Sequence, residues 1–537
     1  MALFVAAGLP QGHSVVFNEA WITQYIDAIS WSNPLPRWLP GLWAGFGGHD
    51  FFFYAPLPFW LGASSVAPLC GTCTPATVLT VTCGLFLIAS GWTMFAFLRS
   101  MFHRQAATAG AIAYMILPYH LLVDWFLRQA VGEFIAFAFL PLVALGMERL
   151  RRDEGGGSVL ALGVAGLCLS HLPTALLAGH VFAVVGIFLA LAGDRRPADR
   201  LRILGSLSLH GGLGLALAAF YWLPAIVLLD NVSPDLLFTE YFEASKWLYP
   251  ASLRDPVRGF ALFIIPCLAC AAPIILAALP GGGSRNRVWV ALPAGCALIL
   301  NLSISEPIWQ EWVIARVQFP WRPTSFIEFS TAVALAALVA NVRSRRSLMV
   351  LASVLILSAV PYTLLATAVL FQMRGSPLEQ TEIDWRGAVE YLSPEMTKAI
   401  GAYQYRNEPS DTGMEATTRA FSALAQEFRS AHRSAETLDR RPRSFSVSPA
   451  AGASDHAIAV QYWHLWRAED ATGVALEIQP DPRFGTLRIM APTGGFTGQP
   501  VTLRLPFQRS EQMGLLLSIL ALLAMAARWI VRRKAAT

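Results

Sequence analysis

Charged residues are scarce in this chain of 537 residues, and lysine is nearly absent. Only 14% of the residues are charged, whereas 55% are hydrophobic, a combination that soluble domains rarely show. Lysine occurs only at positions 246, 398 and 534, and the formal net charge of +5 is scattered along the chain. We therefore expect no nucleic-acid partner, because a basic surface is missing. The composition instead indicates an integral membrane protein that contacts membrane lipids.

The short motifs of nucleotide-driven and hydrolytic enzymes are also missing. No G-x-x-x-x-G-K-[ST], H-E-x-x-H or G-x-S-x-G sequence occurs, so we expect neither a cytosolic nucleotide-driven mechanism nor a bound metal. Two of the seven cysteines, Cys267 and Cys270, lie in an apolar run, where metal-binding thiolates would be costly. Cys70 and Cys73 either form a disulfide in an oxidising compartment or remain thiols.

Long apolar runs dominate what is present, and they predict an α-helical polytopic membrane protein with about 11–13 spans. A short or re-entrant helix is expected over 51–69. Clusters of arginine fall in every second loop, which places these loops and the C-terminus in the cytoplasm. The clear spans are predicted at 77–98, 106–119, 130–147, 158–170, 173–192, 203–229, 259–279, 288–304, 325–341, 348–370 and 513–531. The extracytoplasmic loops are then 10–76, 119–129, the turn 171–172, 230–258, 305–324 and 371–512.

Composition divides the chain into three parts. Residues 1–370 are expected to form the transmembrane module, with residues 10–76 as a first loop on the outer face. Residues 371–512 are polar and contain alternating runs such as "GVALEIQP" and "GTLRIMAP", which are typical of antiparallel strands. They predict an extracytoplasmic α+β domain that ends in a small β-sandwich. Residues 513–537 are expected to be a C-terminal transmembrane anchor with a basic cytoplasmic tail.

The first outer loop is rich in aromatic rings. Residues 17–31 have the spacing of a short helix with one apolar face, which favours a position in the plane of the membrane interface. The stretch "NPLPRWLPGLWAGFGGHDFFFYAPLPFWLG" follows at 33–62. Because Trp, Tyr and Phe collect at membrane–water boundaries, we expect this stretch to lie at the outer surface of the membrane.

Four ionisable residues of this loop are candidates for a site: His13, Glu19, His49 and Asp50. Glu19 is either a solvated residue of the interfacial helix or a general base for an acceptor hydroxyl. Asp50 is either the cap of a helix beginning near Phe51 or that base. We favour Glu19 as the base and Asp50 as the cap. Both carboxylates are expected to face one cavity with His13, and His49 is expected to be a hydrogen-bonding neighbour.

Three other outer segments each supply an ordered cation or histidine near the membrane plane. "YHLLVDWFLRQAVGEF" contains Asp124, Arg128 and Glu133, "SHLPTALL" contains His171, and "QFPWRPTSFIEF" contains Arg322. Mutual ion pairing, a structural histidine at a helix break and interfacial anchoring are the simpler explanations. Arginine also holds phosphate through its planar fork, so the three segments could together cradle a lipid-linked phosphate.

These segments, with "GHSVVFNEAWITQYIDAIS", resemble a family of bacterial multi-spanning membrane proteins described as 6-pyruvoyl-tetrahydropterin synthase-related and close to the YfhO-like proteins. The resemblance covers most of residues 10–370. These families resemble GT-C glycosyltransferases, which move a sugar from a polyprenyl-phosphate carrier to an acceptor outside the membrane. Arg128, Glu133, His171 and Arg322 match family motifs, but a serine, Ser14, stands where the family has an acidic residue after Gly-His.

The resemblance implies a GT-C-type glycosyltransferase of the bacterial inner membrane with its active face outside. Its partners would be a polyprenyl-phosphate-linked sugar and an envelope glycan or lipid acceptor, and no cofactor or metal is expected. Glu19 or Asp50 would be the base, Arg128, Arg322 and His171 would bind the donor phosphate, and the other candidates would support them. The alternatives are a lipid or polymer transporter and a non-catalytic envelope assembly protein. The sugar and the acceptor are not identified by the sequence.

Overall fold

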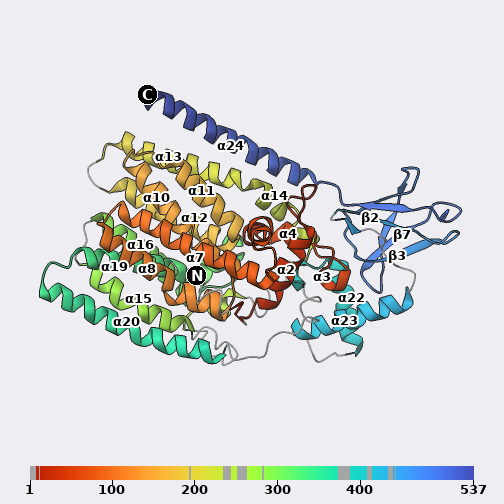
Figure 1. Cartoon of the computed structure of the whole chain (residues 1–537), viewed down its shortest axis with the longest axis horizontal. Coiled ribbons are helices and arrows are strands. Elements are labelled where there is room, and N and C mark those ends of the chain that lie inside the picture. Colours follow the sequence, from red (N-terminus) through yellow and green to blue (C-terminus); the bar gives the residue numbers. More distant parts are fainter. Residues whose placement is uncertain are drawn as a thin grey trace.

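The computed structural model describes most of the chain. The described residues are 8–10, 12–192, 195–233, 243–250, 263–280, 284–372, 387–407, 414–432, 440–441 and 443–536. Parts of the predicted outer loop 230–258 and of the predicted outer domain, including 373–386, lie outside these ranges. The side chains of the predicted basic tail at 532–537 also lie outside them. Figure 1 shows long helices side by side, with short helices and strands gathered at one end.

The long helices form because their apolar runs satisfy the backbone hydrogen bonds within each segment. Each predicted span coincides with a helix or with a helix broken in two, so the helical prediction is confirmed. These helices are α7 (Pro75–Arg99), α8 (Arg104–Ile116), α9 (Val131–Ala136), α10 (Leu140–Arg151), α11 (Gly157–Ser170), α12 (Leu172–Leu191), α13 (Pro197–Leu217), α14 (Ala219–Val227), α15 (Ile264–Ala278), α16 (Ser284–Asn301), α19 (Thr324–Ala340), α20 (Arg345–Gln372) and α24 (Arg509–Ala536). The predicted loop 119–129 is also helical over most of its length, as η2 (Tyr119–Leu127).

Not all of these helices are long enough to cross a membrane alone. Among the described residues, six segments qualify by length and apolar composition, and α13 with α14 makes a seventh if this pair, bent by 74°, is one span. The helices α11, α15 and α19 are apolar but have only 14, 15 and 17 residues. The polytopic helical fold is therefore confirmed, whereas the number of about 11–13 spans stays a prediction.

The first loop folds into short helices at one end of the bundle. They are α2 (Val15–Ala28), α3 (Leu42–Gly45), α4 (Asp50–Phe53), α5 (Leu57–Leu61), η1 (Gly62–Val66) and α6 (Ala67–Cys70). The last three occupy the predicted helical stretch 51–69. Cys70 and Cys73 form a disulfide at the exposed turn before α7, which decides between the two alternatives that the sequence left open.

The aromatic rings of the first loop are largely buried inside the protein, whereas the predicted position of this stretch at the outer surface of the membrane stays a prediction. Trp38, Trp43 and Phe52 are buried. Trp43 packs against Phe421 with ring centres 4.9 Å apart, and Phe52 packs against Trp463 at the same distance. The rings are covered by the C-terminal part of the chain, because burial in a packed protein core gives them more contacts than the interface does.

The C-terminal part contains two helices and two antiparallel sheets. The helices are α22 (Pro394–Asn407) and α23 (Met414–Ala431). One sheet has the order β1-β2-β8-β4-β5 and the other has the order β3-β7-β6. The strands are β1 (Arg440–Arg441), β2 (Ser444–Val447), β3 (Asp455–Gln461), β4 (Arg467–Glu469), β5 (Ala475–Leu476), β6 (Ile478–Pro480), β7 (Thr486–Met490) and β8 (Val501–Arg504). Both sheets share one core with Trp38 and Phe52, which confirms the predicted strands and their packing as a small sandwich.

The break between α13 and α14 is held by the start of α24. Ser518 Oγ accepts a hydrogen bond from the Phe220 backbone N–H at 3.0 Å, so a backbone group freed by the bend is satisfied. Nearby, the buried Glu511 carboxylate lies 3.0 Å from Arg37 Nε and 2.5 Å from Arg443 Nη2. These contacts join the first loop, the five-stranded sheet and α24, and they fix α14 against the first loop.

Candidate functional site

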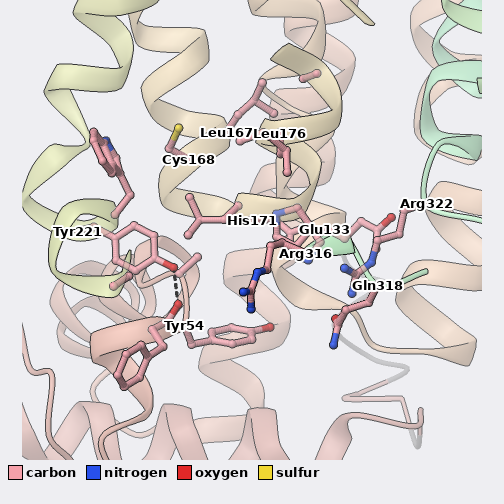
Figure 2. Close-up of a pocket in the computed structure, with 18 of the residues that line it drawn as sticks. Tyr54, Glu133, Leu167, Cys168, His171, Leu176, Tyr221, Arg316, Gln318 and Arg322 are labelled. Atoms are coloured by element: carbon pink, nitrogen blue, oxygen red, sulfur yellow. Dashed lines mark hydrogen bonds and ion pairs between the residues drawn. The ribbon is translucent and has the colours of Figure 1, made fainter. Parts of the chain in front are cut away.

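A large cavity of about 2120 Å³ lies between the first loop, helices α10 to α14 and two later segments, 316–322 and 388–404. Its polar end is lined by His13, Arg128, Glu133, His171, Arg316, Arg322 and Glu390. Its apolar arm runs between α10, α11, α12 and α13 and is lined by residues such as Met147, Leu160, Leu176, Ile187 and Leu207. Figure 2 shows Leu167 and Leu176 on one side of His171, and Arg316, Gln318 and Arg322 on the other.

Arg128 lies at the centre of a buried charge network at the polar end. Its Nη1 donates to Asp124 Oδ1 at 2.6 Å and to Glu133 Oε2 at 2.8 Å, and Tyr119 Oη donates to Glu133 Oε1 at 2.6 Å. Burial alone would lower the pKa of Arg128, but Glu133 and Asp124 outweigh it and raise the pKa. The predicted ion pairing of Asp124, Arg128 and Glu133 is therefore present, and Arg128 also faces the cavity.

Arg322 joins the same network from a segment almost 190 residues away. Its Nε lies 3.5 Å from Glu133 Oε2, and its Nη1 donates to the Val317 carbonyl at 2.5 Å. Burial lowers the pKa of Arg322, and the charge of Glu133 acts against this shift. One carboxylate thus stands between two guanidinium groups that both line the cavity. Because Asp124 also pairs with Arg128, two carboxylates stand against these two guanidinium groups.

His171 lies close to the two arginines, whose charges act on it. His171 is the single residue between α11 and α12, and it is the N-cap of α12. Its Nδ1 accepts a hydrogen bond from the Thr174 backbone N–H at 3.3 Å. Burial, followed by the charge of Arg322, lowers the pKa of His171 to about 3. Because Nδ1 accepts a hydrogen bond, the proton of the neutral ring lies on Nε2. His171 is therefore both a structural cap and a possible hydrogen-bond donor to a cavity ligand.

The carboxylates predicted as catalytic do not line this cavity, so the expectation that Glu19 and Asp50 share it with His13 is wrong. His13 does line it, and burial followed by the charge of Arg128 lowers its pKa. Glu19 is half-buried on α2 but is not a lining residue, and burial raises its pKa. His49 is fully buried with its ring 4.1 Å from that of Trp463.

Asp50 connects distant parts of the chain through hydrogen bonds and is not a helix cap. This corrects a second expectation. His49 is the N-cap of α4, and its side chain caps nothing there. Asp50 Oδ1 instead accepts hydrogen bonds from Trp21 Nε1 at 2.8 Å and from the Ala388 backbone N–H at 3.3 Å. The partner that decides its position lies 338 residues away, so the sequence offers no local signal for it.

Several cavity residues were not singled out from the sequence. Glu390 and Tyr391 come from the segment before α22, Arg316 precedes the predicted span at 325–341, and Tyr54 follows the aromatic run. Burial, with a smaller effect from Asp50, raises the pKa of Glu390 to about 7. Burial also raises the pKa of Tyr54 to about 12. No motif marks these residues, and the only available signal was their position in segments assigned to the outer face.

Across the described ranges, no group of three or more His, Cys, Asp or Glu side chains is arranged to hold a metal ion. The polar end of the cavity is instead a set of guanidinium, imidazole and carboxylate groups. Such a set suits an anion, and phosphate in particular, because arginine donates paired hydrogen bonds to its oxygens.

Residues 51–373 match the model of a family of membrane proteins named the 6-pyruvoyl-tetrahydropterin synthase related domain. The chain therefore belongs to this family, as its sequence motifs indicated. The matched region contains α7 to α20 and all of the buried charge network. No curated protein is significantly similar in sequence.

Two transferases are among the solved structures to which the chain is similar. One is the arabinofuranosyltransferase AftD from Mycobacteria, with 19% identity, a TM-score of 0.40, and coverage of 69% of this chain and 27% of that chain. Another is the oligosaccharyltransferase AglB from Archaeoglobus fulgidus, solved with an inhibitory peptide and a dolichol-phosphate. It has 13% identity, a TM-score of 0.38, and coverage of 78% of this chain and 56% of that chain. The chain thus spans about a quarter to a half of the length of these proteins.

Proposed function

We propose that the chain is a membrane glycosyltransferase that moves a sugar from a polyprenyl-phosphate carrier to an envelope glycan or lipid. The proposed location is the extracytoplasmic face of a bacterial inner membrane. The observation that carries this proposal is the form of the cavity, in which an arginine-bearing polar end continues into a long apolar arm. A lipid-linked phosphate has the same two parts. The family resemblance and the GT-C enzymes that it suggests support the same reaction class.

The polar end would act mainly by electrostatics. When the bond between the sugar and the phosphate breaks, negative charge grows on the departing polyprenyl phosphate. Arg128 and Arg322 are already fixed by Glu133, so they can stabilise this charge without rearrangement. The Nε2 proton of His171 is a third donor. With two arginines as counter-charge, the reaction needs no bound metal, and the lipid-linked sugar is itself the substrate.

The direct test is binding of undecaprenyl phosphate to the purified protein in nanodiscs, with undecaprenol as the uncharged comparison. Arg322→Gln should weaken binding of the phosphate by about 10- to 150-fold, because a hydrogen bond to a charged group contributes about 1.5–3 kcal/mol. Arg128→Lys should also weaken it, since a point charge cannot replace the planar fork. Arg343→Gln, at an exposed loop position, is the matched control and should bind normally.

The same preparation then separates the candidate functions. Sugar transfer from a panel of polyprenyl-phosphate hexoses and pentoses to envelope acceptors supports the glycosyltransferase. Movement of polyprenyl phosphate across proteoliposome membranes without sugar transfer would favour the transporter. Equal binding of undecaprenyl phosphate and undecaprenol, unchanged in the Arg322 and Arg128 variants, would overturn the proposal. Melting temperatures check that each variant is folded.

A further inference from the structure

Three carboxylates line the cavity within the described residues: Glu133, Asp230 and Glu390. Transfer to an acceptor hydroxyl is aided by a group that takes the hydroxyl proton. Glu133 forms ion pairs with Arg128 and Arg322 and accepts a hydrogen bond from Tyr119. If Glu133 took up a proton, the two buried guanidinium groups would lose the negative charge that they share. Asp230 is exposed in the short turn after α14, where water sets its surroundings. Glu390 is half-buried at the cavity wall and has neither limitation.

We propose that Glu390 is the catalytic base of the transfer and that Asp50 positions it, an inference that rests on the proposed function. Glu390 takes the proton of the acceptor hydroxyl while the acceptor oxygen forms its bond to the anomeric carbon of the sugar. The bond between this carbon and the phosphate oxygen breaks, and its electron pair leaves with the polyprenyl phosphate. The new negative charge then lies near Arg128 and Arg322, and the proton on Glu390 passes to water.

The segment that carries Glu390 is held firmly by the first loop. The Ala388 backbone N–H donates to Asp50 Oδ1, which also accepts from Trp21 Nε1. Gly387 lies so close to Trp43 that a Cβ atom there would stand 2.2 Å from Trp43 Nε1, so this position has room for glycine alone. The backbone leading into Glu390 is therefore fixed from two directions.

The residue after Glu390 is fixed as well. The Tyr391 ring stacks on Phe53 with centres 5.8 Å apart, and the Tyr391 N–H donates to the Ala388 carbonyl at 3.0 Å. Phe53 closes α4, the same short helix that begins with Asp50. A base needs a defined position relative to the bond that reacts. The turn 388–391 provides one, because α4 holds it at both ends.

The surroundings of Glu390 also match the work of a base near neutral pH. Burial first, and the charge of Asp50 second, raise the pKa of Glu390 to about 7, and a base is most effective when its pKa lies near the working pH. The charged and titratable groups around it are Asp50, Tyr54 and Tyr391. The other charged and titratable groups at the polar end of the cavity are His13, Arg128, Glu133, His171, Arg316 and Arg322. Transfer should therefore increase as the pH rises through about 7.

The test measures sugar transfer and undecaprenyl phosphate binding in parallel. Glu390→Gln should lower the turnover number by roughly 100-fold or more, the usual scale for a lost general base, and should remove the rise in rate near pH 7. Its undecaprenyl phosphate affinity should be that of the wild type. Glu390→Asp should restore part of the rate if folding is intact. Glu395→Gln, at a half-buried carboxylate in the first turn of α22 that does not line the cavity, is the matched control and should transfer normally.

Asp50→Asn tests whether the charge of Asp50 acts on Glu390, by a readout that simple destabilisation would not produce. The amide oxygen can still accept from Trp21 and Ala388, but the neighbouring negative charge is gone. The rise in rate should therefore move to lower pH, because a source of the raised pKa of Glu390 has been removed. An unshifted profile in Asp50→Asn would remove Asp50 from the inference.

The outcomes also separate this inference from the proposed function. Wild-type transfer by Glu390→Gln, with the Arg322 variant still defective in phosphate binding, would overturn Glu390 as the base and leave the glycosyltransferase standing. Absence of transfer by the wild-type protein with every donor in the panel, together with no preference for undecaprenyl phosphate over undecaprenol, would overturn both.

Discussion

Leucine in place of Gly211 should narrow the apolar arm of the cavity without disturbing the fold. Gly211 lines this arm on α13, and a Cβ added there meets no atom within 4 Å. Leucine is also a better helix former than glycine by up to about 1 kcal/mol, so α13 should stay helical. The neighbouring Gly212 is equally open but is not among the lining residues. Gly212→Leu is therefore the matched control.

Narrowing the arm should weaken the binding of a lipid-linked donor by steric repulsion and not by a loss of hydrophobic burial. A polyprenyl tail that enters the arm leaves one apolar environment, the bilayer, for another, so the transfer of apolar surface out of water contributes little. What remains is the repulsion between the new side chain and the tail. Forcing extra methylene groups into a filled space costs about 1–3 kcal/mol, which corresponds to about a 5- to 150-fold weaker affinity.

The assay compares undecaprenyl phosphate with farnesyl phosphate, whose short tail places fewer carbons in the arm. For Gly211→Leu, we expect the affinity for the long ligand to fall by the factor given above and the affinity for the short ligand to stay unchanged. Gly212→Leu should bind both ligands as the wild type does. Equal affinities of the two leucine variants for undecaprenyl phosphate would refute the placement of the tail between α12 and α13.

Two further predictions concern stability and orientation. Burial raises the pKa of Asp50 to about 6 from an ordinary value near 3.9, so the folded protein keeps a proton that the unfolded chain releases. The stability that this provides is complete below about pH 4 and is lost as the pH rises to about 6. When the pH rises from 4 to 7, the free energy of unfolding should fall by about 3 kcal/mol less in Asp50→Asn than in the wild type. Thermal unfolding at several pH values measures this, and the same pH dependence in both proteins would contradict it. For orientation, a cysteine at Tyr405, which is 80% exposed, should react with a membrane-impermeant maleimide in intact cells, whereas one at Ser344 should react only after permeabilisation. The reverse pattern would invert the assigned topology.

Much of the fold follows from local features of the sequence. A run of apolar residues satisfies its own backbone hydrogen bonds as a helix, so α7, α12, α20 and α24 can be located without knowing their neighbours. Alternation of apolar and polar residues locates β7 and β8, because successive side chains of a strand point to opposite faces. The charge network is partly local as well. Asp124, Arg128 and Glu133 lie within ten residues of one another, so their pairing was an expected alternative.

The location of the proposed base depends on contacts between parts of the chain that are hundreds of residues apart. Asp50 was a candidate because it is a carboxylate in an outer loop, but its partner Ala388 turns it away from the cavity and into a buried junction. From the sequence, the aromatic run around Phe52 is predicted to be an interfacial anchor, but in the fold Trp463, two residues after β3, packs against Phe52. Glu390 carries no motif, and only the packing of its turn on α4 brings it to the cavity wall. Hydropathy and periodicity depend on residues that are neighbours in the sequence, so they can be determined from the sequence alone. Which carboxylate lines the cavity depends on contacts between distant residues, so only the tertiary structure determines it.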